Sequence, residues 1–193
     1  MKRIILNIGE FAVSKEPAVL ETILGSCVAV CLWDEVRSIG GLNHYLLPQE
    51  QHGATKSTTY GATSIDVMVK EIIAIGADIN NLQAQIFGGG SVITALDDIF
   101  NIGAENVWIA QEKMHHYGIP VVGEYVRGKN GIRVIFKTCT GEVVTRPLGE
   151  QSGRVSKTES NAVRQIMQPC KECIMCGSCA ELLNRRRHNK INK

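Results

Sequence analysis

The stretch Ser26-Cys-Val-Ala-Val-Cys-Leu-Trp33 is followed, after a polar break, by Ser38-Ile-Gly-Gly-Leu-Asn-His-Tyr-Leu-Leu47. Both stretches are apolar and rich in β-branched or aromatic residues, which is typical of strands. An antiparallel hairpin that turns at Glu35-Val36 would set Cys27 directly opposite His44. Directly opposed residues have Cβ atoms roughly 4.5–5.5 Å apart, so the sequence predicts that the thiol and the imidazole meet.

A thiol beside an imidazole is suited to attack on an amide carbonyl. The imidazole can take the thiol proton and later protonate the leaving amine. Gly25-Ser26, just before the cysteine, allow a tight backbone whose N–H groups could face a developing oxyanion. The imidazole also needs a group that orients it. Thr22 is the best candidate, and the alternatives are Glu21, Asn43 and Asp34.

The same residues also allow a purely structural interpretation. A cysteine on an apolar strand is usually a core residue, and this is the prediction for Cys31 and Cys139. His44 lies in an apolar strand and could be a core histidine whose hydrogen bonds are satisfied. The residue pattern alone leaves both interpretations open.

Composition narrows the class of protein. The chain has 193 residues, of which 44% are hydrophobic, as in an ordinary soluble α/β protein. Aromatic residues make up 5%, too few for a stacking surface, so we expect no nucleic-acid binding. The apolar run at the N-terminus is too short for a signal peptide or a membrane span. Seven cysteines without an export signal indicate a cytoplasmic protein with no membrane insertion.

The rest of the first 149 residues predicts a mixed α/β or α+β sandwich. Further strands are expected at residues 2–7, 18–24, 83–87, 121–126, 133–137 and 143–146, and helices at 64–75 and 104–117. Gln49 to Gly61 reads as a polar loop. Gly88-Gly-Gly-Ser91 lacks the Lys-Ser/Thr of a phosphate-binding loop, so we predict a tight turn or a close backbone approach beside the site.

The last residues form a separate, basic region. Residues 1–149 carry 12 Lys and Arg against 15 Asp and Glu, net −3, and residues 150–193 carry 9 against 4, net +5, which together give +2. We predict a polar linker at 150–168 and a Cys-rich basic tail at 169–193. The spacing Cys170-x-x-Cys173-x-x-Cys176-x-x-Cys179 suits zinc or an iron–sulfur cluster, but it fits neither pattern cleanly. A reduced tail without a ligand is the alternative.

Two segments resemble the signature of the CheD family, the chemoreceptor glutamine deamidases. They are Thr22-Ile-Leu-Gly-Ser-Cys-Val-Ala-Val-Cys-Leu-Trp-Asp34 and Gly40-Gly-Leu-Asn-His-Tyr-Leu-Leu-Pro48. Tyr60-Gly61, Ile86-Phe-Gly-Gly-Gly90, Asn101-Ile-Gly-Ala-Glu-Asn-Val107 and Thr140-Gly-Glu142 agree in order and spacing. The resemblance covers residues 1–149, which we therefore expect to form a deamidase domain.

The resemblance implies a three-layer α/β/α sandwich, similar to CheD and to deamidases of the cytotoxic-necrotizing-factor type. It implies a Cys–His–Thr triad, which falls here on Cys27, His44 and Thr22, although some members have the threonine at the position of Glu21. The implied reaction converts glutamine of methyl-accepting chemotaxis receptors to glutamate, with no cofactor needed for catalysis. The same chemistry could hydrolyse glutamyl methyl esters.

The resemblance also implies a CheC-type phosphatase as a partner. Two rival functions stay open: a Cys/His hydrolase with another amide or ester substrate, and a regulatory module that only docks on receptors or on CheC. A pure docking module would need neither Cys27 nor His44.

Overall fold

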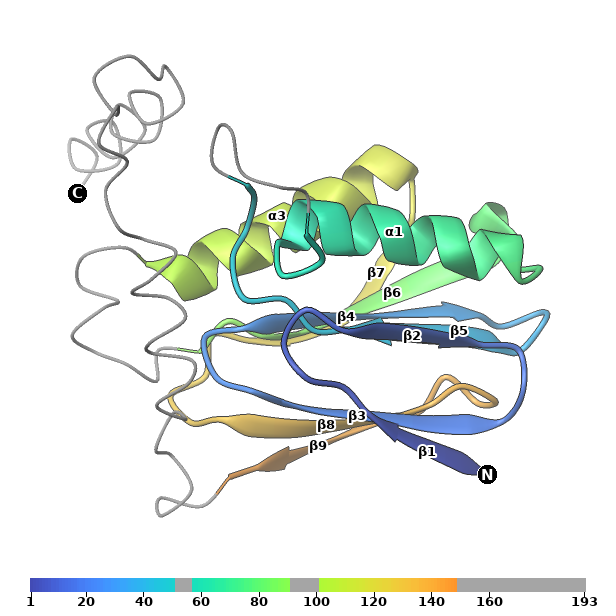
Figure 1. Cartoon of the computed structure of the whole chain (residues 1–193), viewed down its shortest axis with the longest axis horizontal. Coiled ribbons are helices and arrows are strands. Elements are labelled where there is room, and N and C mark those ends of the chain that lie inside the picture. The colour runs from blue at the N-terminus through green and yellow to red at the C-terminus, as the bar shows by residue number, and fades with distance from the viewer. Residues whose placement is uncertain (51–56, 91–100, 149–193) are drawn as a thin grey trace.

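The computed structural model describes residues 1–50, 57–90 and 101–148, which form two sheets and two α-helices (Figure 1). One sheet has the strand order β2-β5-β4-β6-β7, and the other has the order β1-β3-β8-β9. The elements are β1 (Lys2–Ile5), β2 (Phe11–Ser14), β3 (Ala18–Leu24), β4 (Val28–Asp34), β5 (Ile39–Asn43), α1 (Gly61–Ala74), η1 (Ile79–Asn81), β6 (Leu82–Gly88), α3 (Ile102–Tyr117), β7 (Val121–Val126), β8 (Ile132–Lys137) and β9 (Val143–Pro147).

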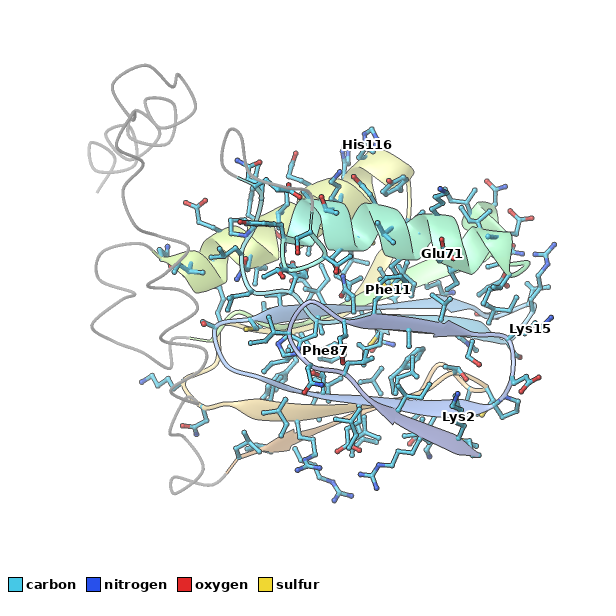
Figure 2. The ribbon with its side chains drawn as sticks, viewed as in Figure 1. Lys2, Phe11, Lys15, Glu71, Phe87 and His116 are labelled. Carbon is cyan, nitrogen blue, oxygen red and sulfur yellow. The ribbon has the colours of Figure 1, made fainter. Side chains whose placement is uncertain are left out.

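The alternating side chains of β4 build two hydrophobic cores. Val28, Val30 and Leu32 pack under helices α1 and α3, whereas Ala29 and Cys31 face the four-stranded sheet. A strand that is buried on both faces reads as a continuous apolar run, which is the pattern seen in the sequence. Figure 2 shows the side chains of the two cores, with the labelled Phe11 in the core under the helices and the labelled Phe87 in the core between the sheets.

The layers differ from the expected order. The mixed α/β class is confirmed, but the described residues stack as helices, sheet and sheet in place of an α/β/α sandwich (Figure 1). The four-stranded sheet buries alternate residues such as Leu20 and Phe136 toward the other sheet. Its outer face carries Arg3, Glu21 and Arg133 in ion pairs, so this face needs no apolar cover.

Most elements lie close to their predicted positions. The strands at 18–24 and 121–126 have the predicted bounds, and both helices begin two or three residues earlier than expected. Strand β2 and the short helix η1 were not predicted. Part of the polar loop, the linker at 150–168 and the tail at 169–193, with the proposed metal ligands Cys170–Cys179, fall outside the described residues. None of the described helices is both long and apolar enough to cross a membrane.

Candidate active site

The hairpin of β4 and β5 has a different register from the predicted one. Cys31 pairs with Leu42, and beyond the strand end Val28 pairs with Tyr45, so Cys27 does not lie directly opposite His44. The register is shifted by two residues. A shift of two leaves every side chain on its original face of the sheet, whereas a shift of one would have moved it to the other face.

The cause of the shift is the turn. Asp34 stays in β4, and its carboxylate accepts hydrogen bonds from the N–H groups of Arg37 at 3.0 Å and of Asp78 at 2.8 Å. The loop therefore comprises the four residues from Glu35 to Ser38, and its centre lies one residue later than predicted. Burial alone would raise the pKa of Asp34, but these hydrogen bonds outweigh burial and lower it.

Cys27 and His44 are consequently diagonal neighbours by extension of this register. Diagonal residues are roughly 7–8 Å apart between Cα atoms, which long side chains can span. Cys27 belongs to the core between the two sheets and is 0% exposed, and His44 is 4% exposed. The site is thus enclosed between the sheets, and a substrate side chain can reach the sulfur only if the covering atoms move.

Thr22 orients the imidazole from the opposite sheet. Its Oγ1 lies 2.9 Å from the carbonyl oxygen of Leu6, to which it donates, and 2.8 Å from Nδ1 of His44. A hydroxyl has one proton, so toward the imidazole Oγ1 presents a lone pair, and Nδ1 carries the hydrogen. In the neutral ring Nε2 is then the basic nitrogen. Within the described part of the chain, this buried Nε2 has no hydrogen-bond partner.

The three alternatives to Thr22 lie elsewhere. Glu21 points to the outer face of its sheet, where it forms ion pairs with Arg3 and Arg133. Asn43 accepts a hydrogen bond from the Val30 N–H at 2.7 Å and donates to Ser64 at 3.0 Å. Asp34 is the last residue of β4, at the far end of the hairpin from Cys27. Of the four candidates, the structure brings only Thr22 to the ring of His44.

Burial makes His44 a weak base. It lowers the pKa of the imidazole from 6.5 to about 4, and the carbonyl of Leu6 and the charge of Glu10 offset only part of this effect. The imidazole is therefore neutral at pH 7 and able to accept a proton at Nε2. A thiolate formed nearby would raise this pKa again, because opposite charges stabilise each other.

The lowered pKa predicts how stability depends on pH. Between pH 6.5 and about 4 the unfolded chain binds a proton at His44 and the folded chain does not, so stability falls as pH falls through this window, by up to about 3 kcal/mol. His44→Gln removes this term. Urea unfolding at a series of pH values should give a flatter profile for the variant between pH 6.5 and 4. Parallel profiles of wild type and variant would contradict the assignment.

The three successive backbone carbonyl groups from Gly25 to Cys27 each accept a hydrogen bond. Gly90 N–H donates to the carbonyl of Gly25, and Gly89 N–H donates to that of Cys27, both at 2.8 Å. The side-chain amide of Asn106 donates to the carbonyl of Ser26 at 3.2 Å. In a trans peptide the N–H points opposite to the preceding C=O. The N–H groups of Ser26 and Cys27 therefore point away from these partners, and they are the candidates for stabilising an oxyanion.

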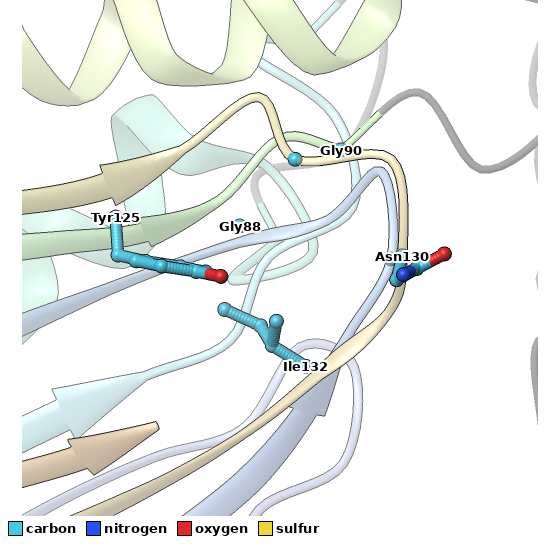
Figure 3. Close-up of a pocket in the computed structure, with 7 residues that line it drawn as sticks. Gly88, Gly90, Tyr125, Asn130 and Ile132 are labelled. Carbon is cyan, nitrogen blue, oxygen red and sulfur yellow. The ribbon is translucent and has the colours of Figure 1, made fainter. Parts of the chain in front are cut away.

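Residues 88–90, the glycine loop, make the close approach of one backbone segment to another that the sequence predicted. Gly88 ends β6 with φ +100°, and a Cβ atom there would lie 2.2 Å from the carbonyl oxygen of Cys27. A pocket opens beside this backbone, and it is lined by Gly25, Gly88, Gly90, Tyr125, Gly128, Asn130 and Ile132 (Figure 3). The four glycines contribute only backbone atoms to its walls.

Gly88→Ala should destabilise the protein by about 3 kcal/mol, because the added methyl combines positive-φ strain with a clash against backbone. Gly118→Ala is the matched control. Gly118 also has positive φ, +67°, but its Cβ would meet nothing within 4 Å, so about 1 kcal/mol of strain is expected. Urea unfolding measures both variants. Equal losses would show that the approach to Cys27 is not as tight as described.

The structure describes two other cysteines, Cys31 and Cys139. Burial strongly raises the pKa of the Cys31 thiol, which makes it a poor nucleophile, and Cys139 is only partly buried. Within residues 1–50, 57–90 and 101–148, no group of three or more His, Cys, Asp or Glu side chains could hold a metal ion.

Sequence reasoning missed two groups at the site, the carbonyl of Leu6 and the side chain of Asn106. The first directly follows β1, which pairs in parallel with β3, and the second lies on a helix 80 residues from Ser26. Asn106 stands in the segment Asn101–Val107 that agrees with the family, and as a polar residue beside apolar ones in a predicted helix it was the available signal.

The site places a buried thiol diagonally across from an imidazole that is hydrogen-bonded to a hydroxyl, an arrangement suited to nucleophilic attack by sulfur. Comparison with known proteins gives the family. Residues 46–147 match the family model described as CheD chemotactic sensory transduction, and the chain belongs to the CheD family.

Three relatives show how far the similarity extends. A probable chemoreceptor glutamine deamidase from Anaeromyxobacter dehalogenans is 38% identical over 146 residues, 76% of this chain and 85% of the relative. One from Acidiphilium cryptum is 39% identical, with 72% and 75% covered. One from Burkholderia mallei is 33% identical, with 83% and 70% covered. A solved structure, the hypothetical protein YfiH of Bacillus licheniformis, covers 61% of this chain and 51% of its own at 17% identity and TM-score 0.39, too low to bear on function.

Proposed function

We propose that this protein is a protein-glutamine deamidase that converts glutamine side chains of chemoreceptors to glutamate. Membership of the CheD family supports the reaction, since relatives at 33–39% identity bear the name chemoreceptor glutamine deamidase. The observation that carries the proposed chemistry is the hydrogen bond between Thr22 and His44 Nδ1, because it leaves Nε2 as the base on the face of the sheet that also bears Cys27.

In the first half of the reaction, the Cys27 thiol gives its proton to Nε2 of His44 as the sulfur attacks the carboxamide carbon. The carbonyl electron pair moves to oxygen, and the N–H groups of Ser26 and Cys27 stabilise the oxyanion. When the carbonyl re-forms, the C–N bond breaks and His44 returns the proton to nitrogen. Ammonia leaves, and the substrate is bound to Cys27 as a thioester.

In the second half, water attacks the thioester while His44 accepts a proton from it. The C–S bond breaks, the sulfur regains a proton from His44, and glutamate is released. A glutamyl methyl ester would form the same thioester with methanol as the leaving group. We therefore propose ester hydrolysis as a secondary activity of the same site.

The test is direct conversion of a receptor substrate. The full-length protein is incubated with receptor cytoplasmic fragments, and conversion of Gln to Glu is mapped by peptide mass spectrometry together with the release of ammonia. A fragment with glutamyl methyl esters at the same positions tests the secondary activity. If the protein binds the fragment but leaves every glutamine and ester intact, it is a docking module and the proposal fails.

The setting of the reaction follows from thiol chemistry. A catalytic thiolate needs reducing conditions, so we place the enzyme in the cytoplasm with the receptor domains it modifies. We further propose a CheC-type phosphatase as a regulatory partner, tested by co-purification and by its effect on the rate of deamidation. The mechanism needs no metal. Zinc or an iron–sulfur cluster at Cys170–Cys179 stays a separate proposal, decided by elemental analysis and visible absorption of anaerobically purified protein.

A further inference from the structure

The backbone hydrogen bonds that pair β4 with β5 and with the segment after it end beside Cys27 and His44. The last of these hydrogen bonds join Val28 and Tyr45 at 3.1 and 3.0 Å. Past this pair the following segment turns away, and the N–H groups of Leu46 and Leu47 donate to the carbonyl of Thr59 at 2.9 and 3.3 Å. The carbonyls of Ser26 and Leu46 therefore need a donor that does not come from this strand pairing.

Asn106 supplies that donor. Its Nδ2 donates to the carbonyl of Leu46 at 2.8 Å and to that of Ser26 at 3.2 Å. A side-chain amide has two hydrogens, so one nitrogen can serve both carbonyls. Ser26 immediately precedes Cys27 and Leu46 follows His44 by two residues, so Asn106 connects the segments that carry the two reacting groups.

Asn106 is itself held firmly. It is 0% exposed in helix α3, and its own carbonyl accepts a hydrogen bond from the Tyr45 hydroxyl at 2.6 Å. The start of the same helix lies against the glycine loop: a Cβ on Gly103 would be 2.5 Å from the carbonyl oxygen of Gly89. Helix α3, the glycine loop and the open end of the hairpin therefore form one tightly packed unit.

This arrangement has an energetic cost. Oδ1 of Asn106 is buried with no hydrogen-bond partner in the described part of the chain. A buried polar atom without a partner is destabilising, and each such atom in a native structure calls for an explanation. Here the amide nitrogen satisfies two carbonyls that flank the reacting groups, which accounts for the orientation of the side chain.

We propose that Asn106 is a positioning residue that sets the separation between the Cys27 and His44 segments. This inference rests on the proposed deamidation. Asn106 acts through the two segments and not on the substrate, so its loss should lower kcat and leave KM nearly unchanged. A displacement of about 1 Å at a catalytic site can lower the rate about 10²-fold.

The test compares Asn106→Asp and Asn106→Ala with wild type. Asn106→Asp keeps the shape of the side chain but places oxygen against two carbonyls. We expect kcat to fall by about 10²-fold in both variants, with KM within about twofold. A second readout needs no substrate: the Cβ resonance of ¹³C-labelled Cys27, assigned by its absence in Cys27→Ala, is titrated with pH. Its midpoint should rise in both variants, because the imidazole then stabilises the thiolate less well.

Thr138→Val is the matched control. Thr138 is also 0% exposed, and its hydroxyl is hydrogen-bonded to Ala18 and Glu16. Ala18 precedes Thr22 by four residues, roughly 13 Å along the strand. Thr138→Val should lose stability comparably but keep both kcat and the Cys27 titration.

Three outcomes decide the inference. Wild-type kcat and titration in the Asn106 variants would overturn it, and so would equal changes in Thr138→Val. If wild type deamidates nothing, the proposed function fails, and the Cys27 titration alone then confirms or overturns the placement by Asn106.

Discussion

Cys27→Ala is expected to abolish conversion of receptor glutamine to glutamate, with a loss of at least about 10⁴-fold in kcat. The reaction as proposed proceeds through a thioester on this sulfur, and alanine leaves no nucleophile at this position. The measurement is the appearance of glutamate in receptor peptides by mass spectrometry. Circular dichroism and urea unfolding establish that the variant is folded.

Cys31→Ala is the control, because Cys31 lies in β4, which begins directly after Cys27, belongs to the same core as Cys27 and is 2% exposed. Burial raises the pKa of its thiol, so it stays protonated and unreactive. Its removal should change kcat by less than about threefold when the rate is expressed per folded protein. Substantial activity in Cys27→Ala, or an equal loss in both variants, would show that Cys27 is not the nucleophile.

The shared face of Cys27 and His44 could be predicted from the sequence, but their register could not. Strand side chains alternate with a period of two, so any turn of even length puts both residues on one face. The exact pairing depends on where the turn begins. Asp34 looks like a loop residue in the sequence. In the structure its carboxylate is buried and accepts hydrogen bonds from the backbone N–H groups of Arg37 and of the distant Asp78. The contact with Asp78 is not visible in the local pattern.

The choice between Thr22 and Glu21 shows a similar limit. Apolar residues flank both positions in β3, since Leu20 and Leu24 share a face with Thr22 and Val19 and Ile23 share one with Glu21. Alternation alone therefore does not say which face is inside. The ion pairs of Glu21 with Arg3 and Arg133 decide it, and these partners come from two other strands.

The layer order and the role of Asn106 both depend on contacts distant in sequence. The helices could be predicted from their periodicity, but not the fact that both cover one face of one sheet. Asn106 contacts residues that are 80 and 60 positions away. Such contacts are set by packing of whole elements, and a single sequence contains no direct signal for them.

His44→Gln is expected to lower kcat by about 10³-fold, because general acid–base catalysis by a positioned side chain contributes roughly 10²–10⁴-fold. Glutamine can still bond to Thr22 but cannot accept and return a proton. In wild type, kcat/KM should fall as pH falls through the pKa of the free imidazole. Burial lowers that pKa from 6.5 to about 4, so the acid limb should lie well below pH 6.5. Initial rates across this range, with circular dichroism at each pH, give the profile.

The comparison with Thr22→Val tests the reason for this behaviour. Thr22→Val keeps the base but removes the hydroxyl that holds hydrogen on Nδ1, so a smaller loss of about 10–10²-fold is expected, and Thr22→Ser should recover most of it. An acid limb that persists unchanged in His44→Gln would assign the titration to another group. If Thr22→Val kept wild-type rates, the tautomer argument would fail, although His44 could still be the base.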